Sequence, residues 1–176
     1  PRLGSNRFLL SPEGVFLSSE TPVNKKMTKQ DGLDLLKKKN KAILRAFNLG
    51  NPKKAEALFL KMEGEGVQAN LQTYKNMIIG RFRTGNTRKA EQIFSRMGQY
   101  GVDPDVATYN CFIHGYKKTR NLEKAEKIFQ KITQSDKIRP DVFSYNSLID
   151  GYAKANKIKK AEEMFSKMKV AGVDPN

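Results

Sequence analysis

One motif returns four times along this chain at nearly constant spacing. The triplet Lys-Ala-Glu places its alanine at positions 55, 90, 125 and 161, so successive copies are 35, 35 and 36 residues apart. In each copy a Phe follows the alanine, at Phe59, Phe94, Phe129 and Phe165, and a Met or Ile follows one turn later. Repetition at such a period is the signature of stacked structural repeats. The sequence therefore predicts a solenoid rather than a single central core.

Within one repeat, apolar spacing predicts two short helices. The third copy carries two apolar sets whose members lie three or four residues apart, which places each set on one helix face. A turn is expected between them, at Thr119-Arg120-Asn121. Neither face can be buried by one repeat alone, so the expected fold is all-α, with about four stacked helix-turn-helix repeats. The two sets are Tyr109, Phe112, Ile113 and Tyr116, and then Leu122, Ala125, Ile128, Phe129 and Ile132.

The repeats are expected to fill an array over residues 33–176. Residues 1–32 match no repeat and are rich in Ser and Pro, so we expect a flexible extension there, held by a protein or ribonucleoprotein partner. At the other end, Met164, Met168 and Val170 have no following helix to cover them. We therefore expect the array to continue or to end on a partner. The repeats span about 36–70, 71–105, 106–141 and 142–176.

The charge balance indicates the chemistry of a partner. The 33 Lys and Arg residues against 18 Asp and Glu give a formal net charge of +15, which favours a polyanion, and nucleic acid before membrane. A Lys-rich solvated face is the alternative interpretation. No apolar run approaches the length of a membrane span. The single cysteine, Cys111, can form neither a disulfide framework nor a zinc site and is expected to fill a core position.

Candidate catalytic residues are lacking in the sequence. The one histidine, His114, has no repeated acid or thiol around it, and no zinc, nucleophile-elbow or phosphate-loop pattern is present. We therefore expect the chain not to be an enzyme by itself, and expect no cofactor and no metal.

The last two repeats resemble the pentatricopeptide repeat. They open with Val-x-Thr/Ser-Tyr-Asn, continue with Gly-Tyr, Ala, Phe and Met or Ile, and close on Pro followed by Asp or Asn. The tetratricopeptide repeat has period 34 and a Trp-containing signature, whereas this chain has no Trp. The resemblance covers residues 36–176. It implies a right-handed superhelical α-solenoid that binds single-stranded RNA in a mitochondrion or chloroplast and acts in RNA processing, stabilisation, splicing or translation.

The resemblance also implies which side chains read the RNA. Arrays of this kind read one base per repeat through two or three side chains, here the Asn of Thr-Tyr-Asn and the last residue of the repeat. An Asn/Asp pair implies U and an Asn/Asn pair a pyrimidine, while Lys75 lies outside the usual code. The alternative is that Asn near a helix start is a cap. The pairs are Asn40 with Asn70, Lys75 with Asp105, Asn110 with Asp141, and Asn146 with Asn176.

Stacking and phosphate contacts complete the expected site. The resemblance assigns base stacking to the second residue of each repeat, and Ala107 and Phe143 hold that place in the last two repeats, after Lys37 and Gln72. Phe143 is the aromatic platform among them. Arg83, Lys118 and Lys154 stand three residues after the glycine of each first helix and would neutralise phosphates along a backbone track.

Four repeats specify only about four nucleotides at one base per repeat, which is too little to select one transcript. Three functions therefore remain open. The chain can be an RNA-metabolism factor, as part of a longer array or guided by a protein. It can be a structural component of an organellar ribosome or another ribonucleoprotein, where it holds ribosomal RNA or neighbouring proteins. It can also be a protein-interaction scaffold.

Overall fold

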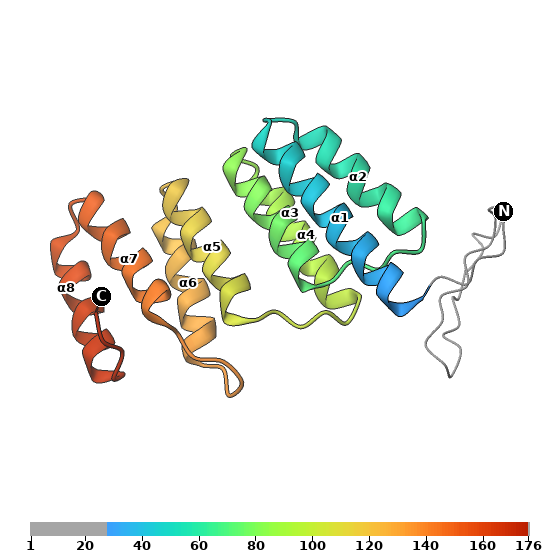
Figure 1. Ribbon diagram of the computed structural model, residues 1–176. Coiled ribbons are helices and arrows are strands. Elements are labelled where there is room, and N and C mark those ends of the chain that lie inside the picture. Colours follow the sequence, from blue (N-terminus) through green and yellow to red (C-terminus); the bar gives the residue numbers. More distant parts are fainter. Residues whose placement is uncertain (1–27, 176) are drawn as a thin grey trace, which may run out of the picture. The chain divides into compact units, whose positions relative to one another are not determined.

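The computed structural model describes residues 28–175, and all regular structure among them is helical (Figure 1). The chain divides into two compact units, Pro1–Ala69 and Asn70–Asn176. In both units the helices come in antiparallel pairs joined by short turns, which confirms the predicted all-α helical-repeat solenoid. The first unit contains α1 (Lys29–Asn48) and α2 (Pro52–Gly64), and the second contains α3 (Leu71–Arg83), α4 (Thr87–Gln99), α5 (Val106–Lys118), α6 (Leu122–Thr133), α7 (Val142–Lys154) and α8 (Ile158–Val170).

The first unit is one helix pair, α1 and α2. Helix α1 starts after a capping box formed by Thr28 and Asp31, within the segment that the sequence assigned to the extension. The Lys39 ammonium, near the middle of α1, forms an ion pair with Glu65 at the end of α2 and so joins the two helices. The expectations for residues 1–27 lie outside the described residues.

In the second unit, polar caps determine where the first helix of each repeat begins. The side chains of Asn70, Asp105 and Asp141 accept hydrogen bonds from the backbone N–H groups three residues later and start α3, α5 and α7. Such a cap satisfies an N–H group that has no partner inside the helix. The Asn or Asp that closes each of these repeats is thus the first structural element of the next one.

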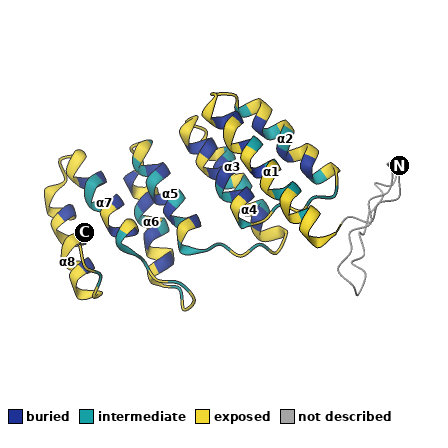
Figure 2. Ribbon diagram, in the orientation of Figure 1, coloured by how far each residue is buried: buried dark blue, intermediate teal, exposed yellow. Residues whose placement is uncertain are grey.

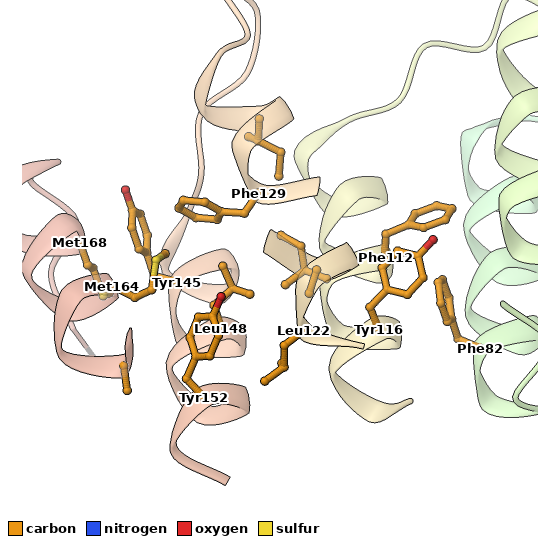
Figure 3. Close-up of a cluster of buried hydrophobic side chains, with 14 of the residues drawn as sticks. Phe82, Phe112, Tyr116, Leu122, Phe129, Tyr145, Leu148, Tyr152, Met164 and Met168 are labelled. Atoms are coloured by element: carbon orange, nitrogen blue, oxygen red, sulfur yellow. The ribbon is translucent and has the colours of Figure 1, made fainter. Parts of the chain in front are cut away.

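The core of the second unit lies between helices of successive repeats, with α5 packed between α3 and α7 (Figure 3). The Phe82 ring of α3 meets the Phe112 and Tyr116 rings of α5 edge-on, each at 5.2 Å between centroids. One repeat further on, the Phe129 ring of α6 meets the Tyr145 ring of α7 at 4.9 Å. The repeated alanine Ala125 is fully buried, as its small size at a close helix approach indicates.

Two glycines allow the first helices to approach their neighbours. A Cβ added to Gly115 would lie 2.2 Å from a ring carbon of Phe82, and one added to Gly151 would lie 2.7 Å from a methyl group of Leu122. Both distances are far inside van der Waals contact, so these positions exclude a side chain unless the neighbour moves.

Candidate nucleic-acid interface

The structure brings together the two members of two predicted reading pairs. In the second repeat the Lys75 ammonium on α3 lies 3.2 Å from Asp105 Oδ2. In the third, Asn110 Nδ2 on α5 donates to Asp141 Oδ1 and Oδ2 at 2.9 and 3.0 Å. Each pair joins a first helix to the cap of the next first helix, so the predicted sites lie at the contacts between repeats.

Ser144, a residue that the sequence did not single out, completes the third-repeat pair. Its hydroxyl donates to Asn110 Oδ1 at 2.6 Å, and Asn110 is only 6% exposed. Both ends of the Asn110 amide therefore have partners, which fixes the orientation of its donor and acceptor. The pair thus places an amide donor beside carboxylate and amide acceptors.

The second-repeat pair differs in charge. An ammonium carries three donors and no acceptor, and Lys75 uses one donor on Asp105. Asp105 Oδ1 accepts from the backbone N–H and the hydroxyl of Thr108 at 2.7 and 2.5 Å. This pair also places a donor beside an acceptor, but the donor is a full positive charge.

Both aspartates stay ionised at neutral pH. Burial alone would raise the pKa of the Asp105 carboxyl, but hydrogen bonds from Thr108 and Lys75 outweigh it and lower the pKa. The pKa of Asp141 is likewise lowered, because the bonds from Ser144 and Asn110 outweigh the effect of burial. Both carboxylates therefore act only as acceptors.

For the other two predicted reading pairs, no contact between the two members is described. Asn146 is exposed on α7, and its expected partner Asn176 lies outside the described residues. Asn40 is buried in α1, in the first unit, whereas Asn70 belongs to the second unit, where it caps α3. The capping alternative thus holds for the residue that closes a repeat and not for Asn110, which lies inside α5.

The predicted stacking residues Ala107 and Phe143 are the second residues of α5 and α7, and both are exposed. Phe143 is 50% exposed. Its ring lies 5.8 Å from the imidazole of His114 on α5. The pKa of His114 is lowered, mainly because burial disfavours the charged imidazole and also because the nearby Lys117 and Lys118 ammonium groups repel it. At neutral pH the imidazole is therefore an uncharged ring beside the Phe143 platform, a role that sequence reasoning did not give it.

The three predicted phosphate-binding cations occupy equivalent places. Arg83, Lys118 and Lys154 are the last residues of α3, α5 and α7, and all three are exposed. Cations in the last turn of a helix also stabilise its negative end. Their recurrence thus has a structural reason as well as a functional one.

An acidic residue lies among these cations. The carboxylate of Asp150 on α7 is 2.8 Å from the Lys154 ammonium and 2.9 Å from that of Lys117 on α5. Hydrogen bonds from Lys154 and Lys117 lower the pKa of Asp150 to about 2. Lys117 was not among the predicted residues. Its ion pair bridges two repeats, and only the stacking of α5 against α7 reveals it.

Among residues 28–175 there is no group of His, Cys, Asp and Glu side chains that could hold a metal ion. No helix in the same range combines the length and apolar character that a membrane crossing requires. The Cys111 thiol is half-buried and donates to the Ala107 carbonyl at 3.1 Å. Burial raises its pKa to about 11, so it remains an unreactive thiol at neutral pH.

Comparison with known families finds matches along most of the array. A model described as "Pentatricopeptide repeat domain" matches residues 57–116, and one described as "PPR repeat family" matches residues 140–176. Two models described as "PPR repeat" match residues 100–133 and 46–67. A comparison with curated proteins finds no match.

Solved structures give the same result. The crystal structure of PPR10 from maize matches with a TM-score of 0.73 and 25% identity, over 82% of this chain and 22% of that one. PPR10 in complex with an 18-nt psaJ RNA element matches with a TM-score of 0.70 and 28% identity, over 78% of this chain and 20% of that one. The PPR domain of Arabidopsis thaliana protein-only RNase P 1, in complex with tRNA, shares the fold at a TM-score of 0.65 and 21% identity, over 82% of this chain and 75% of that domain. The chain thus spans about a fifth of the length of PPR10.

Proposed function

The chain belongs to the pentatricopeptide repeat family, and from this premise we propose that it binds single-stranded RNA along its first helices. One observation carries the proposal. On α3 and α5, a donor–acceptor pair lies at each reading position, and an exposed cation ends the same helix. Base edges need donors beside acceptors, and the RNA backbone needs positive charge at regular intervals. PPR10, which is similar over part of its length, was solved with RNA.

In this proposal the third repeat reads one base through Asn110 and Asp141. The carboxylate and the orientation-locked amide present fixed hydrogen-bonding groups, and the family's code gives U for this pair. The exposed ring of Phe143 supplies a stacking surface, an interaction worth roughly 1–3 kcal/mol per base. The bound RNA is a transcript or ribosomal RNA of a mitochondrion or chloroplast, and the chain acts in RNA processing, stabilisation, splicing or translation without an enzymatic activity of its own.

The phosphate track is tested by salt dependence. Replacing Arg83, Lys118 and Lys154 with Ala should weaken the binding of every single-stranded RNA about equally. It should also reduce the log–log salt slope by roughly 2, at ~0.7 per phosphate. The matched control removes the same charge from second helices, by replacing the exposed Lys53, Lys127 and Lys131 of α2 and α6 with Ala. Fluorescence anisotropy in which both triple variants bind alike would refute a track along the first helices.

Base reading is tested by one substitution. The family's code predicts that Asn110→Thr, with Asp141 unchanged, shifts the preferred base from U towards G. A mismatched hydrogen-bonded pair costs ~1–3 kcal/mol, so relative affinities should change about tenfold. Competition between oligonucleotides that differ at one base measures the change. Identical base rankings for the wild type and the variant would show that this repeat does not read sequence.

A protein-interaction scaffold is the second candidate. It is favoured by the finding that the recurrent Asp residues are helix caps and that the recurrent cations stabilise helix ends. Neither recurrence therefore requires RNA. A structural role in a ribonucleoprotein predicts RNA binding without base preference, so the two experiments separate the three functions.

A further inference from the structure

Arg120, in the turn between α5 and α6, has a backbone conformation that favours glycine. Its φ is +59°, and its N–H donates to the Lys117 carbonyl at 3.0 Å in the turn that ends α5. At the equivalent turns after α1 and α3 the same place is taken by Gly50 and Gly85, with φ of +69° and +71°. A side chain in this region costs free energy that glycine avoids. Arg120 is therefore not the residue that folding alone would select here.

Lys157 makes a second departure of this kind. It occupies the N-cap position of α8 and forms no side-chain cap hydrogen bond. An asparagine cap accepts a hydrogen bond from a backbone N–H that has no partner inside the helix, and each of the other second helices has one. These caps are Asn51, Asn86 and Asn121. At Lys157 the chain has a positive charge in place of a cap.

Two further cations lie in the first turns of second helices. Arg88 and Lys159 are the second residues of α4 and α8, and neither helix has an acidic residue in its first turn. The N-terminal end of a helix carries a partial positive charge, which a cation there opposes. These cations thus differ from the predicted phosphate-binding residues, which lie at the ends of first helices and stabilise them.

We name Arg88, Arg120, Lys157 and Lys159 the turn-edge patch. In the second unit the turns after α3, α5 and α7 lie along one side (Figure 1), and the helix ends there are exposed (Figure 2). All four side chains are exposed, and no ion pair joins any of them to another residue from 28 to 175. Glu123 is the acid in the first turn of α6. The turn-edge patch therefore presents a positive charge at each of the three turns.

The composition of this surface favours one kind of polyanion. The segments that form it, 84–88, 119–121 and 155–159, contain no aromatic residue. Protein interfaces are typically anchored by aromatic side chains, and single-stranded RNA is bound by stacking on them. Double-stranded RNA is instead recognised through its phosphates and 2′-hydroxyl groups. Lysine and arginine donate hydrogen bonds to both.

We propose that the turn-edge patch binds the backbone of a double-helical RNA stem that adjoins the single strand on the first helices. The patch continues from the ends of these helices, since Arg120 follows Lys118, the last residue of α5, by two residues. A stem contact accounts for the places where a cation replaces the residue that local folding favours. The position of the stem beside a single strand rests on the proposed function, whereas binding of the stem itself does not.

The experiment compares two RNA probes by fluorescence anisotropy, a fully paired hairpin and oligouridylate, which forms no stem. The double variant Arg120→Gly with Lys157→Asn places the residues of the equivalent turns at both positions. Its affinity for the hairpin should fall roughly tenfold at about 0.1 M salt, and the log–log salt slope should decrease by ~2, at ~0.9 per duplex phosphate. Its affinity for oligouridylate should be unchanged.

Thermal unfolding of the same variant distinguishes a binding role from a structural one. The melting temperature should rise, by about 2–4 °C for each repaired position in a chain of this length, because glycine relieves the turn and asparagine restores the cap. A lower melting temperature would mean that the two cations support the fold, and the proposal would then be wrong.

Two control variants separate backbone relief and net charge from the patch. Asn156→Gly relieves a turn with a φ of +56° without a change of charge, so it should raise the melting temperature and leave hairpin binding unchanged. Lys131→Gln removes an exposed charge from the last turn of α6 and should also leave hairpin binding unchanged.

Hairpin affinity that the double variant leaves unchanged would overturn the proposal. The same holds if the double variant weakens both probes equally, or if Lys131→Gln weakens hairpin binding as much as the double variant does. A wild-type chain that binds the hairpin but not oligouridylate would refute the proposed function and leave the turn-edge patch in place.

Discussion

The second unit contains two junctions between successive repeats. Their residue types agree on the side of the second helices and differ on the side of the first helices. At the junctions of repeats 2 and 3 and of repeats 3 and 4, a Glu of one repeat accepts from a Tyr hydroxyl and a Lys ammonium of the next, an arrangement that we call the inter-repeat clamp. The clamps are Glu91 with Tyr116 and Lys124, and Glu126 with Tyr152 and Lys160. On the first helices the junctions diverge. The reading position holds Lys75 with Asp105 at one and Asn110 with Asp141 at the other. Asp150 bonds Lys117 at the later junction, where the equivalent residues of the earlier one are His114 and Phe82.

This difference separates two tasks within one repeat. The second-helix side is uniform in residue types, since the same Glu, Tyr and Lys join the repeats at both junctions. The first-helix side tolerates different pairs because the clamp and the apolar core already define the stacking. Between these two junctions of the second unit, the residue types thus differ on the first helices, the side to which we assign the proposed RNA binding.

The largest expected effect is a loss of folding stability, and it should differ between the glycines of the two junctions. Gly115→Ala should destabilise the chain by ~1–3 kcal/mol, because the new Cβ would lie within the Phe82 ring, which is packed between Phe112 and Tyr116. Gly151→Ala should cost less, since the nearest atom is a terminal methyl of Leu122, which can move. Urea unfolding of the full chain measures both.

The matched control for these variants is Gly98→Ala. Gly98 lies in α4, and a Cβ there would meet nothing within 4 Å. The substitution should stabilise by about 0.5–1 kcal/mol through helix propensity alone. If Gly115→Ala were equally stabilising, the Phe82 contact would not constrain the junction.

The next largest effect is a change in base preference when the reading residues of the two junctions are exchanged. Lys75→Asn, beside Asp105 and Thr108, should give repeat 2 the base preference of repeat 3, and the reciprocal Asn110→Lys should remove that preference from repeat 3. Hydrogen-bonded base discrimination is worth ~1–3 kcal/mol, so enrichment at one RNA position should change about tenfold. Selection from a randomised single-stranded RNA pool measures it. Unchanged base frequencies for both variants would show that these pairs only join repeats.

A smaller, pH-dependent effect should be equal at both junctions. The Lys124 ammonium and the Tyr116 hydroxyl lower the pKa of Glu91, and the Tyr152 hydroxyl and the Lys160 ammonium lower that of Glu126. A lowered native pKa means that the unfolded state binds more protons, so this stabilisation is present above the ordinary glutamate pKa of ~4.3 and is lost as the pH falls through the native value.

Unfolding experiments on Glu91→Gln and Glu126→Gln check this expectation. Each variant should be less stable than the wild type by about 0.5 kcal/mol at pH 7, the size typical of partly exposed ion pairs. The difference should vanish in acid. Glu162→Gln is the control at the same triplet position and should show no difference at either pH. A loss confined to one junction would contradict the equivalence of the two clamps.

The fold was predictable because its determinants are local and periodic. The spacing of Ala125 and Phe129 and their equivalents gives the helices, and the terminal Asp or Asn of a repeat gives the start of the next helix. The fixed period then gives the stacking without any long-range contact having to be known. The start of α1 at Lys29 was missed because the first repeat lacks the Val-x-Thr-Tyr-Asn opening and because Thr28 supplies a cap instead.

The candidate site was predictable only in part. The family resemblance identified Asn110 and Asp141 as a pair, but not that Ser144 locks the amide, since that contact depends on how α5 packs against α7. The inter-repeat clamp has a sequence signature in its recurrent Lys, Glu and Tyr, yet their partners lie 25 to 34 positions apart and become neighbours only through stacking. The bond of Lys154 to Asp150 has a sequence signal, since residues four apart on one helix are neighbours, whereas the bond of Lys117 to Asp150 depends on the stacking of two repeats.

The smallest expected effect concerns Asp150, which exists at only one of the two junctions. Its carboxylate lies between the ammonium groups of Lys117 and Lys154 and cancels part of their charge along the proposed phosphate track. Asp150→Asn should therefore raise the affinity for single-stranded RNA at about 0.1 M salt, by roughly two- to fourfold for exposed charges at this range. It should also steepen the log–log salt slope by ~0.7 if one more lysine reaches a phosphate.

Glu123→Gln makes the same charge change on α6 and should leave the affinity unchanged, because long-range attraction is screened within about 10 Å at 0.1 M salt. Equal gains from the two variants, measured by fluorescence anisotropy, would mean that RNA senses only the net charge of the chain, and the first helices would then lose their distinction from the second.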